Sequence, residues 1–295
     1  MSESDLFNKF NVSSLPSEIK DSLIFNLDSY QFFLKQLFSK PKSFVDEWLN
    51  EERQYISDKY FYKDTKLDWK WGLCFPFFSL LERYTISFNQ PVIIGFSGLP
   101  GSGKSTLGDW IGHLSTVLDL SIKVISLDDF YLPANEMDIA MKGNPWNVPR
   151  GIPGSHSIDL INDTLDSYLR TGNLKHPKFD KSLRNGLGDR SGWSESTPNV
   201  LVLEGWFVGC EPIKDRTKLN NTFDNINNLS LNSLECEYRH IIQDRLNEYN
   251  KVWRMFYKIW HLKSTNIENT ISWKTQQENE MLNLKGSALT GDKLS

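Results

Sequence analysis

From residue 91 onward, short apolar runs alternate with stretches that have helical periodicity. The apolar runs cover residues 92–96, 122–127 and 200–203. Between the first two, leucine and isoleucine recur at helical spacing over residues 105–118. Strands that alternate with helices pair in parallel, so this part of the chain is predicted to be an α/β domain, a parallel sheet flanked by helices.

The first 90 residues carry a different pattern. Amphipathic stretches at residues 30–38 and 44–49 predict helices, and Pro41 and residues 89–91 interrupt them. No motif there carries chemistry. We therefore expect an added helical N-terminal region, residues 1–90, packed on a main domain of residues 91–295.

The main domain contains a long polar tract with many glycines and prolines, residues 141–193, in which one helix is predicted at 158–169. Tracts of this kind are usually functional loops, so we expect lid or substrate loops here. Farther along, the predicted elements are an asparagine-rich loop at 220–232, helices at 237–255 and 267–284, and a segment at 260–263 that is too short to establish a last strand.

The composition limits the partners and the compartment. The 295-residue chain has a formal net charge of -4 and a pI near 5.8, whereas nucleic-acid binders need a strongly basic face. Three widely spaced cysteines fit neither disulfides nor a metal site. The acidic N-terminus lacks a signal-peptide pattern, and no apolar stretch reaches membrane-spanning length. We expect a cytoplasmic monomer with no nucleic-acid or membrane partner.

A glycine-rich motif follows directly on the first apolar run. Its sequence fits G-x-x-x-x-G-K-[ST], the phosphate-binding loop of P-loop NTPases, between a predicted strand and a predicted helix. Glycines let backbone amides wrap a polyphosphate, and the start of the helix adds its positive dipole end. The predicted ATP-binding residues are Gly98, Leu99, Pro100, Gly101, Ser102, Gly103, Lys104, Ser105 and Thr106.

Acidic residues stand where two of the predicted strands end. Asp128 and Asp129 follow the second run, and the carboxyl ends of parallel strands lie near the phosphate loop. One carboxylate would accept the proton of an attacking hydroxyl, and the other would orient the metal or Lys104. Glu204 follows the third run, in the Walker-B-like position. With Lys104 these are the predicted catalytic residues, and Ser105, Asp128 and Glu204 are the predicted Mg²⁺ ligands.

Further segments resemble known kinases. A phosphate loop followed by Ser-Leu-Asp-Asp-Phe-Tyr at 126–131 looks like the group of small-molecule kinases that contains phosphoribulokinase, uridine kinase and pantothenate kinase. The chain also resembles the D-glycerate 3-kinase family in segments at 144–145, 150–156, 179–182, 188–190 and 203–207, and more weakly at 273–280.

This resemblance implies ATP-dependent phosphorylation of D-glycerate to 3-phosphoglycerate, with Asp128 as the catalytic base. A small hydroxy acid needs cations for its carboxylate, and the tract from 150 to 190 is rich in them. An arginine near the γ-phosphate is often required, and either Arg150 or Arg190 fits this role. The predicted substrate-binding residues are Arg150, His156, Lys181, Arg184 and Arg190.

Three features depart from the family pattern. Ser157 stands where the family usually has aspartate, and Lys274 stands where it has arginine, whose bidentate fork lysine cannot reproduce. The sequence also ends soon after Gly286, where relatives commonly continue into one more helix. We therefore expect either weakened activity or a diverged relative.

Three alternatives fit part of the sequence. A GTPase would need an Asn-Lys-x-Asp motif, which does not occur downstream of the loop, and the D-x-x-G at 189–192 follows no apolar strand. The same kinase chemistry could serve uridine, pantothenate or a sugar phosphate, which residue spacing does not separate. A non-catalytic ATP-binding protein would have no physical reason to keep Lys104, Asp128 and Glu204.

Overall fold

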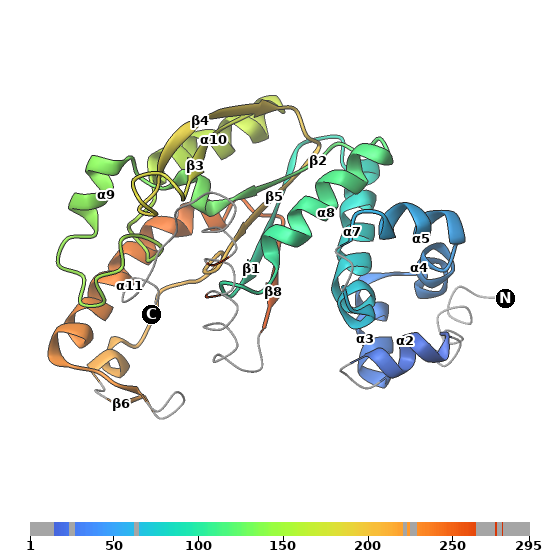
Figure 1. Cartoon of the computed structure of the whole chain (residues 1–295), viewed down its shortest axis with the longest axis horizontal. Coiled ribbons are helices and arrows are strands. Elements are labelled where there is room, and N and C mark those ends of the chain that lie inside the picture. Colours follow the sequence, from blue (N-terminus) through green and yellow to red (C-terminus); the bar gives the residue numbers. More distant parts are fainter. Residues whose placement is uncertain are drawn as a thin grey trace. The chain divides into compact units, whose positions relative to one another are not determined.

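The computed structural model describes residues 15–23, 27–61, 65–220, 223–224 and 229–263, and positions 275 and 279 (Figure 1). The chain divides into two compact units. One contains the residues up to Asn89 together with Thr106–Ile122, and the other contains Gln90–Ser105 and the chain from Lys123 onward. Apart from positions 275 and 279, the helix predicted at 267–284 lies outside the described residues, as does Lys274.

The described part of the first unit is helical. The predicted helices at 30–38 and 44–49 are confirmed as α3 and α4, and Pro41 begins α4, because proline is well tolerated in the first helical turn. The helices are α2 (Ser17–Ser22), α3 (Leu27–Leu37), α4 (Pro41–Trp48), α5 (Glu51–Asp58), α6 (Leu67–Trp69), the π-helical turn η2 (Lys70–Cys74), α7 (Phe75–Ser87) and α8 (Lys104–Val117).

Aromatic side chains form the core of this unit. Trp48 is fully buried, stacks on Phe75 at 4.0 Å between ring centroids, and donates from Nε1 to Ser79 Oγ at 2.7 Å. Trp110 of α8 donates from Nε1 to the carbonyl of Ser57 at 3.2 Å. Buried indoles of this kind combine a large apolar area with one satisfied hydrogen bond, which favours a single packing arrangement.

The second unit contains the predicted sheet. Its strand order is β2-β5-β1-β8, and β1 pairs in parallel with both β5 and β8. The strands are β1 (Val92–Gly98), β2 (Ile122–Ser126), β5 (Val200–Gly205) and β8 (Lys258–Leu262). Residues 260–262 of the segment at 260–263 therefore belong to a strand. Every residue of β1 and β5 is buried, as their continuous apolar sequences predict for central strands.

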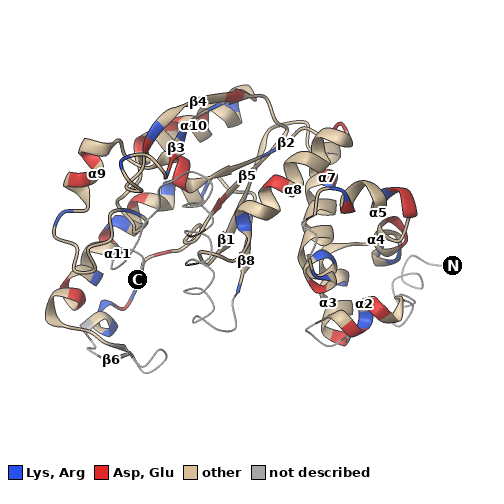
Figure 2. Ribbon diagram, in the orientation of Figure 1, with Lys and Arg blue, Asp and Glu red and all other residues tan. Residues whose placement is uncertain are grey.

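Two long helices (Figure 1) pack on this sheet, and their apolar side chains share one buried cluster with those of the strands. They are α10 (Ile158–Thr171) and α11 (Ser233–Trp253), which confirm the predicted helices at 158–169 and 237–255. Ile161 and Leu165 of α10 share one buried cluster with Leu201 of β5. Acidic and basic residues are interspersed along α11 (Figure 2), so the helix carries no long block of like charge.

The tract at 141–193 contains more regular structure than predicted. Strands β3 (Leu174–Asp180) and β4 (Asp189–Ser196) form an antiparallel hairpin, although we predicted loops there. Between β2 and α10 the chain forms the 3-10 turn η3 (Leu127–Phe130) and α9 (Ala134–Ala140). The 3-10 turn η4 (Arg216–Asn220) leads into the asparagine-rich segment, which contains two short paired strands, β6 (Phe223–Asp224) and β7 (Leu229–Ser230).

None of the described helices combines the length and the apolar character needed to cross a membrane.

Candidate active site

The phosphate loop leaves the carboxyl end of β1 and leads into α8. Gly101 and Gly103 have φ angles of 75° and 82°, which glycine adopts at no steric cost. A Cβ at Gly98 would lie 3.1 Å from Ser102 Oγ, so the start of the loop has little room for a side chain. Lys104 Nζ donates to the carbonyl of Leu99 at 2.9 Å. Ser102 Oγ is buried and has no hydrogen-bond partner among the described residues, as expected of a donor reserved for a ligand.

Lys104, Asp128 and Glu204 lie close enough for each charge to act on the others. Burial lowers the pKa of Lys104, while the carboxylates of Glu204 and Asp128 raise it. Glu204 is 6% exposed, and burial raises its pKa against the opposing effects of Lys104 and a hydrogen bond from Ser126. The structure therefore brings together three of the four residues that we predicted to be catalytic.

Asp128 forms an ion pair with Lys181, the first residue after β3. The distance from Lys181 Nζ to Asp128 Oδ2 is 2.6 Å. Burial alone would raise the pKa of Asp128, but the Lys181 ammonium and a hydrogen bond with Tyr131 lower it to about 2. Asp128 is thus a carboxylate throughout the neutral range, and one cation from the predicted substrate tract already lies beside it.

Tyr131 forms a hydrogen bond with this carboxylate, and the buried His156 and Tyr249 lie behind Tyr131 in one contact network. The His156 ring stacks on Tyr131 at 4.5 Å, and His156 Nδ1 is 2.8 Å from the hydroxyl of Tyr249. His156 Nε2 is buried without a partner among the described residues. Sequence reasoning gave no role to either tyrosine. Tyr131 belongs to the segment that carried the family resemblance, whereas nothing in the sequence of α11 distinguishes Tyr249.

Of the three arginines in the predicted substrate set, two contact the surroundings of Asp128 and one is paired elsewhere. Arg150 is buried and donates to the carbonyls of Gly186 and Leu187 at 2.8 and 2.7 Å, and its charge acts on both Lys181 and Tyr131. Arg190 Nε donates to the carbonyl of Tyr131 at 3.2 Å, while its Nη2 is buried without a described partner. Arg184 forms an ion pair with Asp138 at 2.7 Å, so its charge is already matched.

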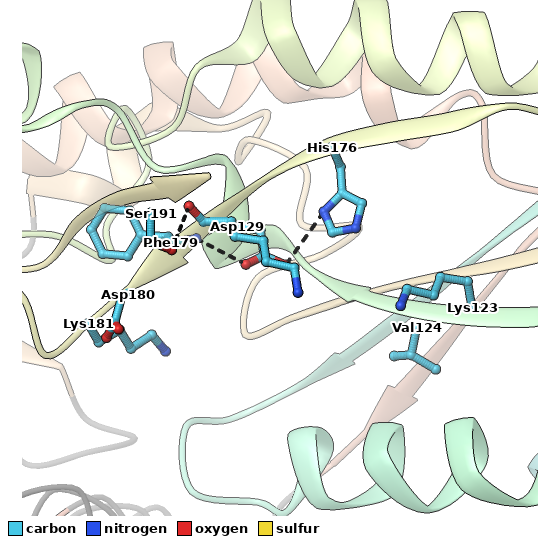
Figure 3. Close-up of a pocket in the computed structure, with 9 residues that line it drawn as sticks. Lys123, Val124, Asp129, His176, Phe179, Asp180, Lys181 and Ser191 are labelled. Carbon is cyan, nitrogen blue, oxygen red and sulfur yellow. Dashed lines mark hydrogen bonds and ion pairs between the residues drawn. The ribbon is translucent and has the colours of Figure 1, made fainter. Parts of the chain in front are cut away.

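Asp129 faces the β3–β4 hairpin (Figure 3). Its carboxylate accepts hydrogen bonds from the backbone N–H of Phe179 at 3.3 Å and of Ser126 at 3.4 Å, and lies 3.9 Å from His176 Nδ1. Burial raises its pKa, which the nearby imidazole partly offsets. These contacts tie the end of β2 to the hairpin.

Ser105 and Thr106, predicted to bind the nucleotide, are exposed at the start of α8.

Comparisons with known proteins identify the family. No family model matches the chain. The probable ATP-dependent kinase TDA10 of Saccharomyces cerevisiae is 31% identical over 221 residues, which cover 69% of this chain and 73% of that protein. The chain belongs to the D-glycerate 3-kinase-like family of P-loop kinases.

Other relatives agree with this membership. The chloroplastic D-glycerate 3-kinase of Arabidopsis thaliana is 36% identical over 135 residues, covering 42% of this chain and 30% of that protein. The solved structure of D-glycerate 3-kinase from Cryptococcus neoformans superposes with a TM-score of 0.58 at 27% identity, covering 73% of this chain and 80% of that one. The predicted P-loop fold class is therefore confirmed for this family member.

The donor set of this family member fits Mg²⁺ only in combination with phosphates. No group of three or more histidine, cysteine, aspartate or glutamate side chains in the described ranges could hold a metal ion. Mg²⁺ usually binds through one or two carboxylates together with substrate phosphates and water. Asp128 and Glu204, with opposing charges nearby and a phosphate loop alongside, match that requirement.

The buried histidine gives the protein a predictable acid sensitivity. Burial lowers the pKa of His156 to about 4, although the Asp128 carboxylate opposes the shift. The unfolded chain therefore takes up a proton near its ordinary pKa before the folded one does, and stability is lost as the pH falls from about 6.5 toward 4. Between about pH 7 and pH 5, wild type should lose about 2 kcal/mol more unfolding free energy than His156→Gln. Urea unfolding of both proteins at the two pH values measures this difference, and equal losses would contradict it.

Proposed function

We propose that the protein is an ATP-dependent kinase that transfers the γ-phosphate of ATP to a hydroxyl of D-glycerate, giving 3-phosphoglycerate. The observation that carries the proposal is the ion-paired Asp128 carboxylate, whose charge acts on Lys104 of the phosphate loop together with that of Glu204. Two similar proteins are D-glycerate 3-kinases by name, which supports this acceptor.

Asp128 is proposed to orient the acceptor hydroxyl and to take its proton. As the hydroxyl oxygen bonds to the γ-phosphorus, the bond to the β–γ bridging oxygen breaks and the proton passes to Asp128. A carboxylate with a pKa of about 2 is a weak base. Phosphoryl transfer passes through a loose transition state, so orientation of the hydroxyl matters more than early proton removal. Lys104 would stabilise negative charge on the outer phosphates as the bond breaks.

Lys181, Arg150 and His156 are proposed to bind the acceptor. Lys181 Nζ is already 2.6 Å from Asp128, so a hydroxy acid that presents its hydroxyl to Asp128 would have its carboxylate within reach of this cation. His156 Nε2, which has no partner among the described residues, is available for a hydrogen bond with a second hydroxyl. Arg190 is proposed to assist through its unpartnered Nη2. Arg184 would first have to leave Asp138, which makes it a weaker candidate.

Mg²⁺ is proposed to be held by the hydroxyl of Ser105 and the carboxylates of Asp128 and Glu204, together with the phosphates. When bound, the ion neutralises charge on the β- and γ-phosphates. Burial of Glu204 against Lys104 keeps its carboxylate in place before the nucleotide arrives.

A coupled assay of ADP release tests this function. The acceptors are D-glycerate, L-glycerate, uridine, pantothenate and ribulose 5-phosphate, each offered to the wild-type protein. We expect kcat/KM for D-glycerate to exceed that for every other acceptor by about a hundredfold, because an unmatched buried polar group in the acceptor site is costly. ³¹P NMR of the product identifies the phosphorylated hydroxyl. A preference for another acceptor would contradict D-glycerate as the substrate. ADP release without any acceptor would indicate an ATPase instead of a kinase.

A further inference from the structure

A cavity of about 440 Å³ lies between β2, η3 and the β3–β4 hairpin (Figure 3). Lys123 of β2, Lys178 and His176 of β3, and Ser191 of β4 contribute to its lining. Lys181 lines it as well, and its ammonium is the group that pairs with Asp128. The cavity therefore adjoins the candidate active site without including the phosphate loop.

His176 brings an unused hydrogen-bonding atom to this cavity. His176 is only 2% exposed, and its Nδ1 lies 2.8 Å from the carbonyl oxygen of Pro177. A carbonyl can only accept, so Nδ1 carries the hydrogen, and Nε2 of the neutral ring is an acceptor. That Nε2 is buried with no partner among the described residues. Figure 3 shows the ring pointing from β3 toward the space between Asp129 and Lys123.

The lining holds three lysines and two carboxylates, and Lys181 is already paired with Asp128. Neither Lys123 nor Lys178 forms an ion pair with any residue in the described ranges, and the charges of both act on His176. Of the two acidic residues in the lining, Asp180 accepts hydrogen bonds from the backbone N–H and the hydroxyl of Ser182, at 2.9 and 2.7 Å. Asp129 accepts the backbone hydrogen bonds described above. The lysines are thus the groups left to meet a ligand.

We propose that this cavity is a second anion site, which binds a phosphate group carrying one hydroxyl hydrogen. The P–OH group donates to His176 Nε2, and the other phosphate oxygens accept from Lys123 and Lys178. Sulfate, which has no hydrogen to donate at neutral pH, should bind less well. The phosphate can come from inorganic phosphate or from the monoanion of a phosphorylated hydroxy acid, the form of the ester that keeps a hydroxyl hydrogen.

An anion bound in this cavity would affect the active site through Lys181, because Lys181 lines the cavity and forms the ion pair with Asp128. A second anion beside Lys181 competes for its ammonium, so the bound anion should act as a partial inhibitor. This consequence rests on the proposed role of Asp128, whereas the binding itself does not.

The test is an NMR titration of the full chain with ¹⁵N-labelled histidine, in the presence of saturating Mg-ADP so that the phosphate loop is filled. Inorganic phosphate, 3-phosphoglycerate and sulfate are added in separate arms, and His176→Gln assigns the His176 signals. We expect phosphate or 3-phosphoglycerate to shift the Nε2 resonance of His176 at millimolar concentration, and the arm with the lower Kd identifies the source.

Matched lysine variants locate the site. Lys123→Met with Lys178→Met should raise the Kd about tenfold or more, because two charge-assisted hydrogen bonds are lost. Lys175→Met, on the same strand but outside the cavity lining, should leave the Kd unchanged. The proposal is overturned if no phosphate compound moves the His176 signal, if sulfate binds as well as phosphate, or if the double variant binds like wild type. None of these readouts uses turnover, so the proposed kinase reaction can fail independently.

Discussion

Replacing Lys104 with alanine is expected to lower kcat about 10³-fold, because the transferring phosphate loses a preorganised cation in a site that excludes much of the water. The burial that lowers the Lys104 pKa also makes its charge effective, and Glu204 and Asp128 keep it protonated. Steady-state kinetics with saturating ATP and acceptor measure the loss.

Two controls accompany this variant. Lys251→Ala removes an exposed lysine of α11 and should leave kcat near wild type. Thermal unfolding of Lys104→Ala should show a folded protein with reduced stability, because Glu204 remains buried after the charge of Lys104 is lost. A folded Lys104→Ala protein with near-normal kcat would contradict the proposed role of the phosphate loop.

Replacing Asp128 with asparagine is expected to lower kcat about 10³-fold as well, within the range that a positioned general base contributes. Asparagine keeps the size of the side chain but cannot take the proton, and it leaves Lys181 without its ion-pair partner. The KM for ATP should change much less than kcat, because the phosphate loop is intact. Single-turnover measurements with ATP bound separate the two quantities.

The matched control for this variant is Asp166→Asn, which removes an exposed acid of α10 that pairs with Arg170 four residues on. It should leave kcat unchanged. Lys181→Met adds a pH readout: without the ammonium that lowers the Asp128 pKa to about 2, burial raises it. The acid limb of kcat should therefore move to higher pH in Lys181→Met, and an unmoved limb would argue that Asp128 is not the group that titrates.

The sheet and its charged ends could be predicted from the sequence because they depend on local patterns. Residues 92–96 and 200–203 are continuous apolar runs, and both are buried central strands. A parallel sheet places the residues that follow its strands along one edge. The proximity of Asp128 and Glu204 to Lys104 could therefore also be predicted from the sequence.

The hairpin and the surroundings of Asp128 could not be predicted in the same way. β3 contains Pro177 and β4 has no buried residue, so neither has the apolar alternation that identifies a strand. The partners of Asp128 and His156 come from three distant segments, including Tyr249 of α11. Such contacts follow from tertiary packing, which residue spacing does not encode. Asp129 illustrates the same limit, because its sequence position beside Asp128 gave no sign that it faces the hairpin.

The strand order also has a consequence for assembly during synthesis. β5 lies between β2 and β1, although it follows them in the chain by more than seventy residues. A growing polypeptide that has emerged only to α10 therefore holds two unjoined apolar strands with open edges, which invites aggregation. When β5 pairs between β2 and β1, it covers both open strand edges and also places Glu204 near Lys104. Chains truncated before residue 200 should consequently depend on chaperones to remain dispersed.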